Sequence, residues 1–248
     1  MLMQRPQVKP VRKTLNHHST FTSESRRNSV VELSITDPLY WLERCGALLL
    51  LALCAPVFMF AMLLISLDSP GPAFFRQKRT GRYGKPFDIV KFRTMVVDAE
   101  RVTGPVLARR NDSRLTSLGA ILRATHLDEL PQLWNVFLGQ MSFIGPRPER
   151  PEFVSSFNSK IAGYDRRHII RPGITGLAQI LLPYDASPED KLVFDLHYLE
   201  NRGSFSLKLW IVAQTMAKAT SPVASFLRPA GIATPGFPSR FKGNIATP

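Results

Sequence analysis

The chain has 248 residues, of which 32 are Lys or Arg and 19 are Asp or Glu, so its formal net charge at pH 7 is +13. A hydrophobic fraction of 44% and a charged fraction of 21% are those of a folded protein and exclude a chain that is disordered throughout. The excess of basic residues predicts a polyanionic partner, which can be nucleic acid, anionic lipid or a phosphorylated substrate.

The first 36 residues are polar, basic and rich in Ser and Thr, and we expect them to be disordered. An apolar run without a charged residue follows from Cys45 to Leu67. As a helix, this run would be about 34 Å long, enough to cross the hydrocarbon core of a bilayer, so residues 37–68 are predicted to enter a membrane. Both cysteines of the chain, Cys45 and Cys54, lie in this run, which excludes a disulfide framework and a zinc site built on cysteines.

Pro56 lies near the middle of the apolar run and predicts a break in the helix, because its ring removes one hydrogen bond and clashes with the carbonyl of Ala52. Basic residues flank the run on both sides, with the stronger cluster after it, which favours the cytoplasm for both ends. From the residues alone, a re-entrant helix hairpin and a kinked single span remain the two alternatives.

The segments AFFRQKR, TGRYGK and PFDIVKFRTM, together residues 73–95, predict a β-hairpin with a glycine-containing loop. Alternation of side chains places Lys91 and Arg93 on the same face of its second strand. Residues 115–124 predict a short helix with Thr116 as its N-cap.

The segment DELPQLWNVFLG, residues 128–139, predicts a second helix that ends at Gly139. Pro131 is acceptable only in the first turn of that helix, which places Asp128 at or beside the N-cap. Three prolines within six residues exclude regular structure from residues 143–151, and residues 171–179 are predicted to form a Pro/Gly loop.

The C-terminal part is predicted to be helical. Phe153, Phe157 and Ile161 recur at helical spacing, two further helices are expected near 188–200 and 204–219, and residues 221–248 are expected to be disordered. The predicted fold class is therefore α+β and mainly helical. A small cytoplasmic catalytic domain, residues 69–220, carries the β-hairpin and amphipathic interfacial helices and follows the membrane helix.

Asp128 and Glu129 form the most informative pair in a chain that is poor in acids. On their own, they are explained as a helix N-cap and a complement to the helix dipole. Basic residues in rigid settings change this interpretation, because they suit phosphate groups, and two carboxylates among them could bind Mg²⁺ or supply a nucleophile and an acid/base. These basic residues are Lys91, Arg93, Arg123 and Arg147, the last within a Pro-Arg-Pro frame.

Three long segments carry a resemblance to a known family: SPGPAFFRQKRTGRYGKPFDIVKFRTM, LRATHLDELPQLWNVFLGQMSFIGPRPERPEF and RRHIIRPGITGLAQ. They resemble the bacterial sugar transferases, the monotopic phosphoglycosyl transferases, from about Leu39 to about Thr220. With 44 residues before the apolar run, the multi-helix membrane domain of the longer members is expected to be missing.

The resemblance implies an enzyme that starts exopolysaccharide or glycoconjugate synthesis at the bacterial inner membrane. It would transfer a sugar 1-phosphate from a UDP-sugar to undecaprenyl phosphate and release UMP, with Mg²⁺ as cofactor and the catalytic domain on the cytoplasmic face. The resemblance also implies that the helix is re-entrant and breaks at Pro56, although Ala55 stands where the family pattern has Ser. The expected partners are the UDP-sugar, undecaprenyl phosphate and inner-membrane lipid, with downstream glycosyltransferases as possible further partners and no nucleic acid.

The resemblance also implies roles for single residues. Asp128 would be the nucleophile that forms a phosphosugar intermediate and would also be a metal ligand, and Glu129 would assist it. Phosphate or substrate contacts are implied for residues in matching segments: Lys91, Arg93, Arg123, Arg147, Gln179 and Asp195.

The identity of the sugar does not follow from the resemblance. UDP-galactose and UDP-glucose are the expected donors, with an N-acetylated sugar as the alternative. A different class of function also fits the charge, namely a membrane-anchored basic module that binds nucleic acid or anionic lipid without chemistry. Such a module would not need Asp128.

Overall fold

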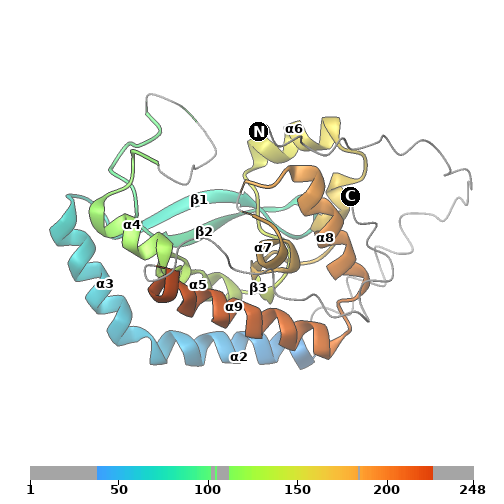
Figure 1. Ribbon diagram of the computed structural model, residues 1–248, viewed down its shortest axis with the longest axis horizontal. Helices are drawn as coiled ribbons and strands as arrows, with labels where there is room; N and C mark the ends of the chain where they lie inside the picture. The colour runs from blue at the N-terminus through green and yellow to red at the C-terminus, as the bar shows by residue number, and fades with distance from the viewer. Residues whose placement is uncertain (1–37, 102–103, 105–111, 184, 226–248) are drawn as a thin grey trace, which may run out of the picture.

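The computed structural model describes residues 38–101, 104, 112–183 and 185–225 (Figure 1). The predicted leader, residues 1–36, lies outside this part of the chain, as does most of the predicted tail. The described residues form mainly helices with two small sheets of two strands each, which confirms a mainly helical α+β fold.

Two consecutive helices, α2 (Pro38–Leu53) and α3 (Ala55–Asp68), contain the apolar run. Pro56 lies in the first turn of α3, where its missing N–H has no intrahelical partner to lose, so the chain bends between the helices by 59°. No single helix in the described part of the chain is long and apolar enough to cross a membrane, whereas this bent pair together meets the criteria of length and composition.

The predicted β-hairpin is confirmed. Strands β1 (Phe74–Thr80) and β2 (Pro86–Phe92) pair antiparallel, from Phe74 opposite Phe92 to Thr80 opposite Pro86. A short 3₁₀ turn, η1 (Arg82–Gly84), closes the loop between them. Ile89 on β2 is buried in a core with α2 and α5, and Phe92 is buried in a second core with α3 and α4, so the hairpin is fixed to both halves of the bent helix pair.

Helix α4 (Ser117–Ala124) begins as predicted, because the side chain of Thr116 accepts a hydrogen bond of 3.0 Å from the backbone N–H of Gly119. The prediction for the next segment is wrong in one respect. Asp128 lies in a 3₁₀ turn, η2 (Leu127–Glu129), and α5 (Gln132–Phe137) begins only after Pro131. Proline has no N–H to continue an α-helical hydrogen-bond pattern, so the chain makes a 3₁₀ turn before it and an α-helix after it.

Two segments that were predicted to be irregular contain short regular elements. β3 (Ser142–Ile144) pairs in parallel with β4 (Gly173–Thr175), and α7 (Leu177–Leu181) follows directly. Glycine makes this pairing possible, because a Cβ on Gly173 would lie 2.0 Å from the backbone nitrogen of Gly145. The glycines and prolines that predicted a loop therefore allow the two backbones to approach closely.

The remaining helices are α6 (Pro151–Lys160), α8 (Pro188–Glu200) and α9 (Phe205–Ser225), with the 3₁₀ segment η3 (Tyr164–Ile169) between α6 and β4. The predicted helix at 188–200 is confirmed, and α9 continues beyond its predicted end. The principal core lies where β3, α7, α8 and α9 meet. Its fully buried members include Leu177, Leu207 and Ile211.

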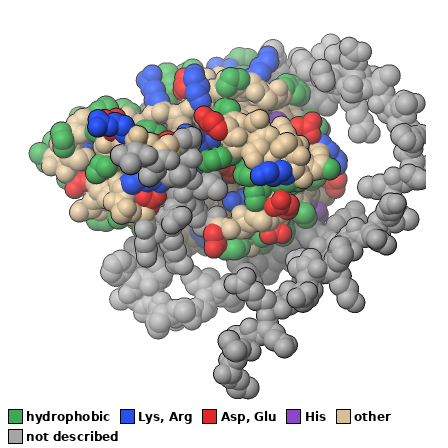
Figure 2. Space-filling model, turned by 90° about the horizontal axis from the view of Figure 1, so that it is seen from above, with side chains coloured by type: hydrophobic (Ala, Val, Ile, Leu, Met, Phe, Trp, Pro, Cys, Tyr) green, Lys and Arg blue, Asp and Glu red, His purple; other side chains and the backbone are tan. Residues whose placement is uncertain are grey.

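The two sides of the molecule differ in their surface. Helix α2 runs along the lower edge of Figure 1. Figure 2 shows the upper face, on the side away from α2, where acidic and basic side chains lie close together. In contrast, α2 and α3 expose many large apolar side chains. The most exposed of them are Leu42, Leu53, Met59, Phe60 and Leu67, each exposed by 62% or more.

Candidate active site

Glu129 lies between two cations. Lys91, near the end of β2, places its Nζ 2.7 Å from Glu129 Oε1. Arg147, in the Pro-Arg-Pro frame between β3 and α6, places Nη2 2.7 Å from Oε1 and Nη1 3.3 Å from Oε2. Only 12% of the Glu129 side chain is exposed. A strand, a turn and a proline-rich loop that are distant in sequence thus meet at one carboxylate.

Asp128 is the neighbour of Glu129 but lies in a different environment. It is 6% exposed. Among the residues that the structure describes, none donates a hydrogen bond to its carboxylate or lies within ion-pair distance of it. A buried carboxylate without a protein donor is costly, and such groups occur where a substrate or a metal supplies the missing partner.

The two carboxylates have opposite pKa shifts. Burial raises the pKa of Asp128, and the adjacent charge of Glu129 raises it further, while Lys91, Arg147 and Arg123 oppose the shift. Burial alone would also raise the pKa of Glu129, but the charges and hydrogen bonds of Arg147 and Lys91 outweigh it and hold this pKa well below its ordinary value. Glu129 is therefore firmly ionised, and Asp128 is the more basic carboxylate of the two.

Arg123 and Arg93 have different surroundings. Arg123, in the last turn of α4, is close enough to lower the pKa of Asp128, and no partner for its guanidinium is found in the described part of the chain. Arg93 lies one residue beyond β2, and its guanidinium donates to the backbone carbonyls that end α3, at 2.7 Å to Ser69. The structure therefore brings Arg123 to the dyad, which is the pair Asp128 and Glu129, whereas Arg93 fixes the end of α3.

Two arginines donate hydrogen bonds to the backbone of the Pro-Arg-Pro frame. Arg167 Nη2 donates to the carbonyl of Arg147 at 3.0 Å, and Arg79 Nη1 donates to the carbonyl of Pro148 at 3.0 Å. The backbone N–H of Thr80 adds a third bond, at 2.8 Å, to the carbonyl of Glu149. These contacts fix the backbone from which the Arg147 guanidinium reaches Glu129.

Asp195 supports this frame and lies away from the dyad. It pairs with Arg167 at 2.7 Å, and both side chains are only 2% exposed. Burial raises the pKa of Asp195 to about 6, although Arg167 opposes the shift. Because Arg167 also holds the Arg147 carbonyl, Asp195 is connected to the dyad through two arginines.

Gln179 also has a structural contact. Its side-chain nitrogen donates to the carbonyl of Ile174 at 3.0 Å, while its buried side-chain oxygen has no hydrogen-bond partner in the described part of the chain. Its backbone carbonyl accepts a hydrogen bond of 2.9 Å from Lys218 of α9. Gln179 thus connects β4, α7 and α9.

Two residues at the site were missed in the sequence. Arg79 and Arg167 look like ordinary members of a basic chain, and only the fold brings them to the Pro-Arg-Pro frame. A signal for Arg79 was its position on β1, next to the strand that carries Lys91. Burial lowers the pKa of Arg79 to about 10, with Arg147 contributing in the same direction, which reflects the crowding of positive charge here.

The donor set limits how a metal ion could bind. The described residues contain no group of three or more His, Cys, Asp or Glu side chains that could hold one. Glu129 is engaged by two cations, whereas no described residue donates to the carboxylate of Asp128. A single carboxylate fits Mg²⁺ when substrate phosphates and water complete the coordination, which is how Mg²⁺ is bound in many phosphate-handling sites.

Comparison with known proteins decides the family. Residues 40–222 match the model of the bacterial sugar transferase family. The chain belongs to the bacterial sugar transferases. It is 40% identical over 185 residues to UDP-N-acetylgalactosamine-undecaprenyl-phosphate N-acetylgalactosaminephosphotransferase of Aeromonas hydrophila, which covers 71% of this chain and 42% of that protein.

Two further relatives give a similar result. The chain is 49% identical over 141 residues to UDP-glucose:undecaprenyl-phosphate glucose-1-phosphate transferase of Caulobacter vibrioides, covering 56% of this chain and 52% of that protein. It is 42% identical over 165 residues to exopolysaccharide production protein PSS of Rhizobium leguminosarum bv. phaseoli, covering 63% of this chain and 81% of that protein. The chain thus spans about half the length of the Aeromonas and Caulobacter relatives.

Proposed function

We propose that this bacterial sugar transferase moves a sugar 1-phosphate from a UDP-sugar to undecaprenyl phosphate, releases UMP and passes through a phosphosugar adduct of Asp128. The observation that carries the proposal is the buried Asp128 carboxylate, to which no described residue donates, next to a Glu129 that two cations hold. The names of the Aeromonas and Caulobacter relatives, which describe undecaprenyl-phosphate sugar phosphotransferases, support it.

The reaction has two displacement steps. A carboxylate oxygen of Asp128 attacks the sugar-linked phosphorus of the UDP-sugar, and the bond from this phosphorus to the bridging oxygen breaks, so UMP leaves with the electron pair. A phosphate oxygen of undecaprenyl phosphate then attacks the same phosphorus, and the carboxylate of Asp128 leaves. The raised pKa of Asp128 makes its ionised form a better nucleophile than an ordinary aspartate.

The cations around the dyad suit the charge of this substrate. Lys91 and Arg147 neutralise Glu129 and still present positive charge to the diphosphate, and Arg123 can bind a phosphate oxygen without breaking a contact in the described structure. Mg²⁺, held by Asp128 and phosphate oxygens, would neutralise charge on the departing UMP.

Glu129 has a more limited role than an acid/base. Its pKa is held well below the ordinary value, so it is a poor proton acceptor near neutral pH. We assign it to the positioning of Lys91 and Arg147 and to the electrostatic support of Asp128. For the transferred sugar we propose glucose or galactose. UDP-sugars with an N-acetyl group are the alternative donors against which this specificity is tested.

We further propose that α2 and α3 form a re-entrant hairpin in the inner membrane, with the catalytic part on the cytoplasmic face. The exposed apolar side chains of both helices and their bend support this topology. Helix α9 adds a row of exposed apolar side chains at helical spacing, which suits contact with the same lipid surface. The row consists of Phe205, Leu209, Val212 and Met216.

The two-step path makes a specific demand, because UMP must leave before the acceptor binds. Detergent-solubilised protein incubated with UDP-glucose or UDP-galactose and Mg²⁺, without undecaprenyl phosphate, should release about one UMP per active site. Intact-protein mass spectrometry should show the mass of one added hexose phosphate. Absence of this burst under conditions of fast full turnover would indicate direct transfer in a ternary complex.

The topology has its own test. In a cysteine-free background, single cysteines introduced near residues 30 and 85 should show the same accessibility to an impermeant thiol reagent in intact spheroplasts. Labelling of one position but not the other contradicts the re-entrant hairpin. Pro56→Leu should shift the protein toward a full span, because the N–H at position 56 could then bond the carbonyl of Ala52 in one continuous helix.

A further inference from the structure

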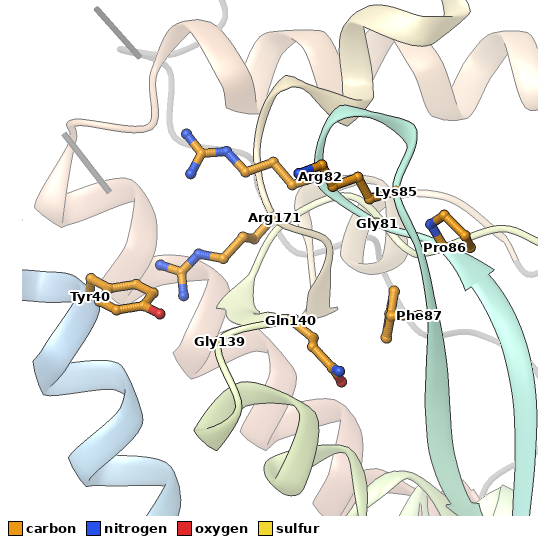
Figure 3. A pocket seen from close by; sticks show the side chains of 9 residues that line it. All are labelled: Tyr40, Gly81, Arg82, Lys85, Pro86, Phe87, Gly139, Gln140 and Arg171. Carbon is orange, nitrogen blue, oxygen red and sulfur yellow. The ribbon is translucent and has the colours of Figure 1, made fainter. Parts of the chain in front are cut away.

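A cavity of about 280 Å³ lies at the other end of the β-hairpin from the dyad, between the hairpin loop, the first turn of α2 and the loop before β4 (Figure 3). Three of its lining residues are cations, namely Arg82, Lys85 and Arg171, and none of the lining residues, all of them in the described part of the chain, is an acid. Lys85 directly precedes β2, and Lys91 lies six residues further along the chain in this strand, which corresponds to about 20 Å in extended backbone. The cavity is therefore separate from the dyad.

Contacts with other parts of the chain hold Arg82 and Arg171 in place at the cavity. Arg82 Nε donates to the carbonyl of Ile169 at 3.1 Å. Arg171 lies over the ring of Tyr40, 4.7 Å from its centroid, and pairs with Glu43 at 2.9 Å. Figure 3 shows the side chains of Arg82 and Arg171 extending in the same direction, that of Arg171 toward Tyr40.

Lys85 is the most available of these charges. It is exposed, and no hydrogen-bond or ion-pair partner for its ammonium group is found among the described residues. Burial lowers the pKa of Arg82, and the like charges of Arg171 and Arg202 contribute to the same shift. Positive charges that repel one another around a cavity are stabilised by a bound anion.

The position of the cavity indicates which anion. Its wall includes Tyr40, and the neighbouring Trp41 is 50% exposed on the same turn of α2. Tyr and Trp side chains of this kind lie at the level of lipid headgroups when a helix enters a bilayer. Gly139 allows the close approach of Tyr40 because it has no side chain. A Cβ at this position would lie 2.5 Å from the Tyr40 hydroxyl.

We propose that this cavity binds the phosphate of an anionic phospholipid from the surrounding bilayer, at a site distinct from the one where the acceptor reacts. The proposal rests on the membrane insertion proposed above, which brings the first turn of α2 to the headgroup layer. Arg82 and Lys85 bind the phosphate oxygens, and Arg171 with Tyr40 forms the wall on the side of α2. The bound lipid would fix the catalytic part against the membrane at a constant height.

The test is lipid retention by the purified full-length protein, followed by native mass spectrometry in a detergent that allows exchange. Phosphatidylglycerol, phosphatidylcholine and inorganic phosphate are titrated separately. We expect one phosphatidylglycerol per chain at concentrations where phosphatidylcholine is not retained. Arg82→Gln with Lys85→Gln should weaken retention about tenfold or more, since charge-assisted hydrogen bonds are lost.

Control variants distinguish binding at the cavity from a general effect of the protein's positive charge. Lys160→Gln with Arg166→Gln removes the same charge from exposed positions on α6 and η3 and should leave retention unchanged. Lys85→Gln alone alters an exposed side chain that has no hydrogen-bond or ion-pair partner among the described residues, so the variant should fold normally and still weaken retention. Equal retention of the two lipids, an equal loss in both double variants, or displacement of the lipid by equimolar inorganic phosphate would overturn the proposal.

The UMP burst is measured on the same preparations. Arg82→Gln with Lys85→Gln should keep the burst, because neither residue lies at the dyad. Retained phosphatidylglycerol in a wild-type protein that shows no burst with any UDP-sugar would refute the proposed function and leave the lipid site standing. A normal burst without selective retention of phosphatidylglycerol would refute the lipid site and leave the proposed function standing.

Discussion

Arg147 and Arg167 each place a guanidinium nitrogen 2.7 Å from a carboxylate, yet the two pairs have different surroundings. The pair of Arg167 with Asp195 is sealed, with both side chains 2% exposed. The pair of Arg147 with Glu129 is partly open, with 36% of the Arg147 side chain exposed, and Lys91 adds a second cation to it. The sealed pair has balanced charge, whereas the open one has an excess of positive charge next to Asp128.

The same type of contact therefore has a different role in each pair. A sealed ion pair gives little net stability, but removing one partner leaves a buried charge without compensation, so the pair fixes a geometry. An open pair with excess charge can still bind an anion. The bond from Arg167 to the Arg147 carbonyl joins the two, so the sealed pair positions the open one.

The largest effect is expected at Asp128. Asp128→Asn replaces the proposed attacking carboxylate with a poor nucleophile and should reduce the UMP burst by at least about 10³-fold. The added hexose phosphate mass should disappear as well. Glu129→Gln is the matched change next to it and should leave a weak burst, since it loosens Lys91 and Arg147 but keeps the nucleophile. A burst of wild-type size from Asp128→Asn would exclude it as the attacking group.

The sealed pair should control stability first and activity second. Asp195→Asn leaves Arg167 buried without its counterion and should lower the free energy of unfolding by about 3–5 kcal/mol, measured by denaturant titration in detergent. Glu200→Gln, an exposed change on the same helix, is the control and should stay within about 0.5 kcal/mol.

A double variant separates the two roles of that pair. Arg167→Met with Asp195→Leu removes both charges and should recover much of the lost stability. The UMP burst should be slower than in the wild type, because the double variant removes the guanidinium that donates to the Arg147 carbonyl. Recovery of both stability and burst rate would show that the pair has no positioning role.

The planar fork of Arg147 can be tested with its charge retained. Arg147→Lys keeps the charge but loses one of the two contacts to Glu129, and we expect the rate of UMP formation to fall roughly 10- to 100-fold. Arg150→Lys is the control three residues away, where the partner is Glu100. Rates equal to wild type for Arg147→Lys would mean that this position supplies only positive potential.

Much of the fold follows from local sequence. The break at Pro56, the N-cap at Thr116, the β-hairpin and the helix at 188–200 each rest on residues that are neighbours in the chain, and each is confirmed. The parallel pairing of β3 and β4 was missed because it joins segments about 30 residues apart through glycines that locally predict loops.

The candidate site divides in the same way. The dyad and the Pro-Arg-Pro frame are short motifs, so Asp128, Glu129 and Arg147 could be selected from the sequence. Arg167 could not, since its effect comes through a backbone carbonyl 20 residues away. The alternation argument paired Arg93 with Lys91, but Arg93 lies after the strand ends, where its guanidinium is free to turn to the carbonyls of α3.

The smallest predicted effect sharpens the contrast between Asp128 and its neighbour. In the proposed mechanism the burst requires ionised Asp128, so its rate should fall as the pH drops through the pKa of this group, which burial and Glu129 raise above the ordinary value. Arg123 opposes that shift, because its charge favours the ionised form. Arg123→Gln should therefore move the midpoint of the acid limb to higher pH, independently of any fall in the maximum rate. Arg166→Gln removes a charge from an exposed position on η3 and should leave the midpoint where it is. A midpoint that stays fixed in Arg123→Gln, or moves to lower pH, would mean that the acid limb reports a group other than Asp128.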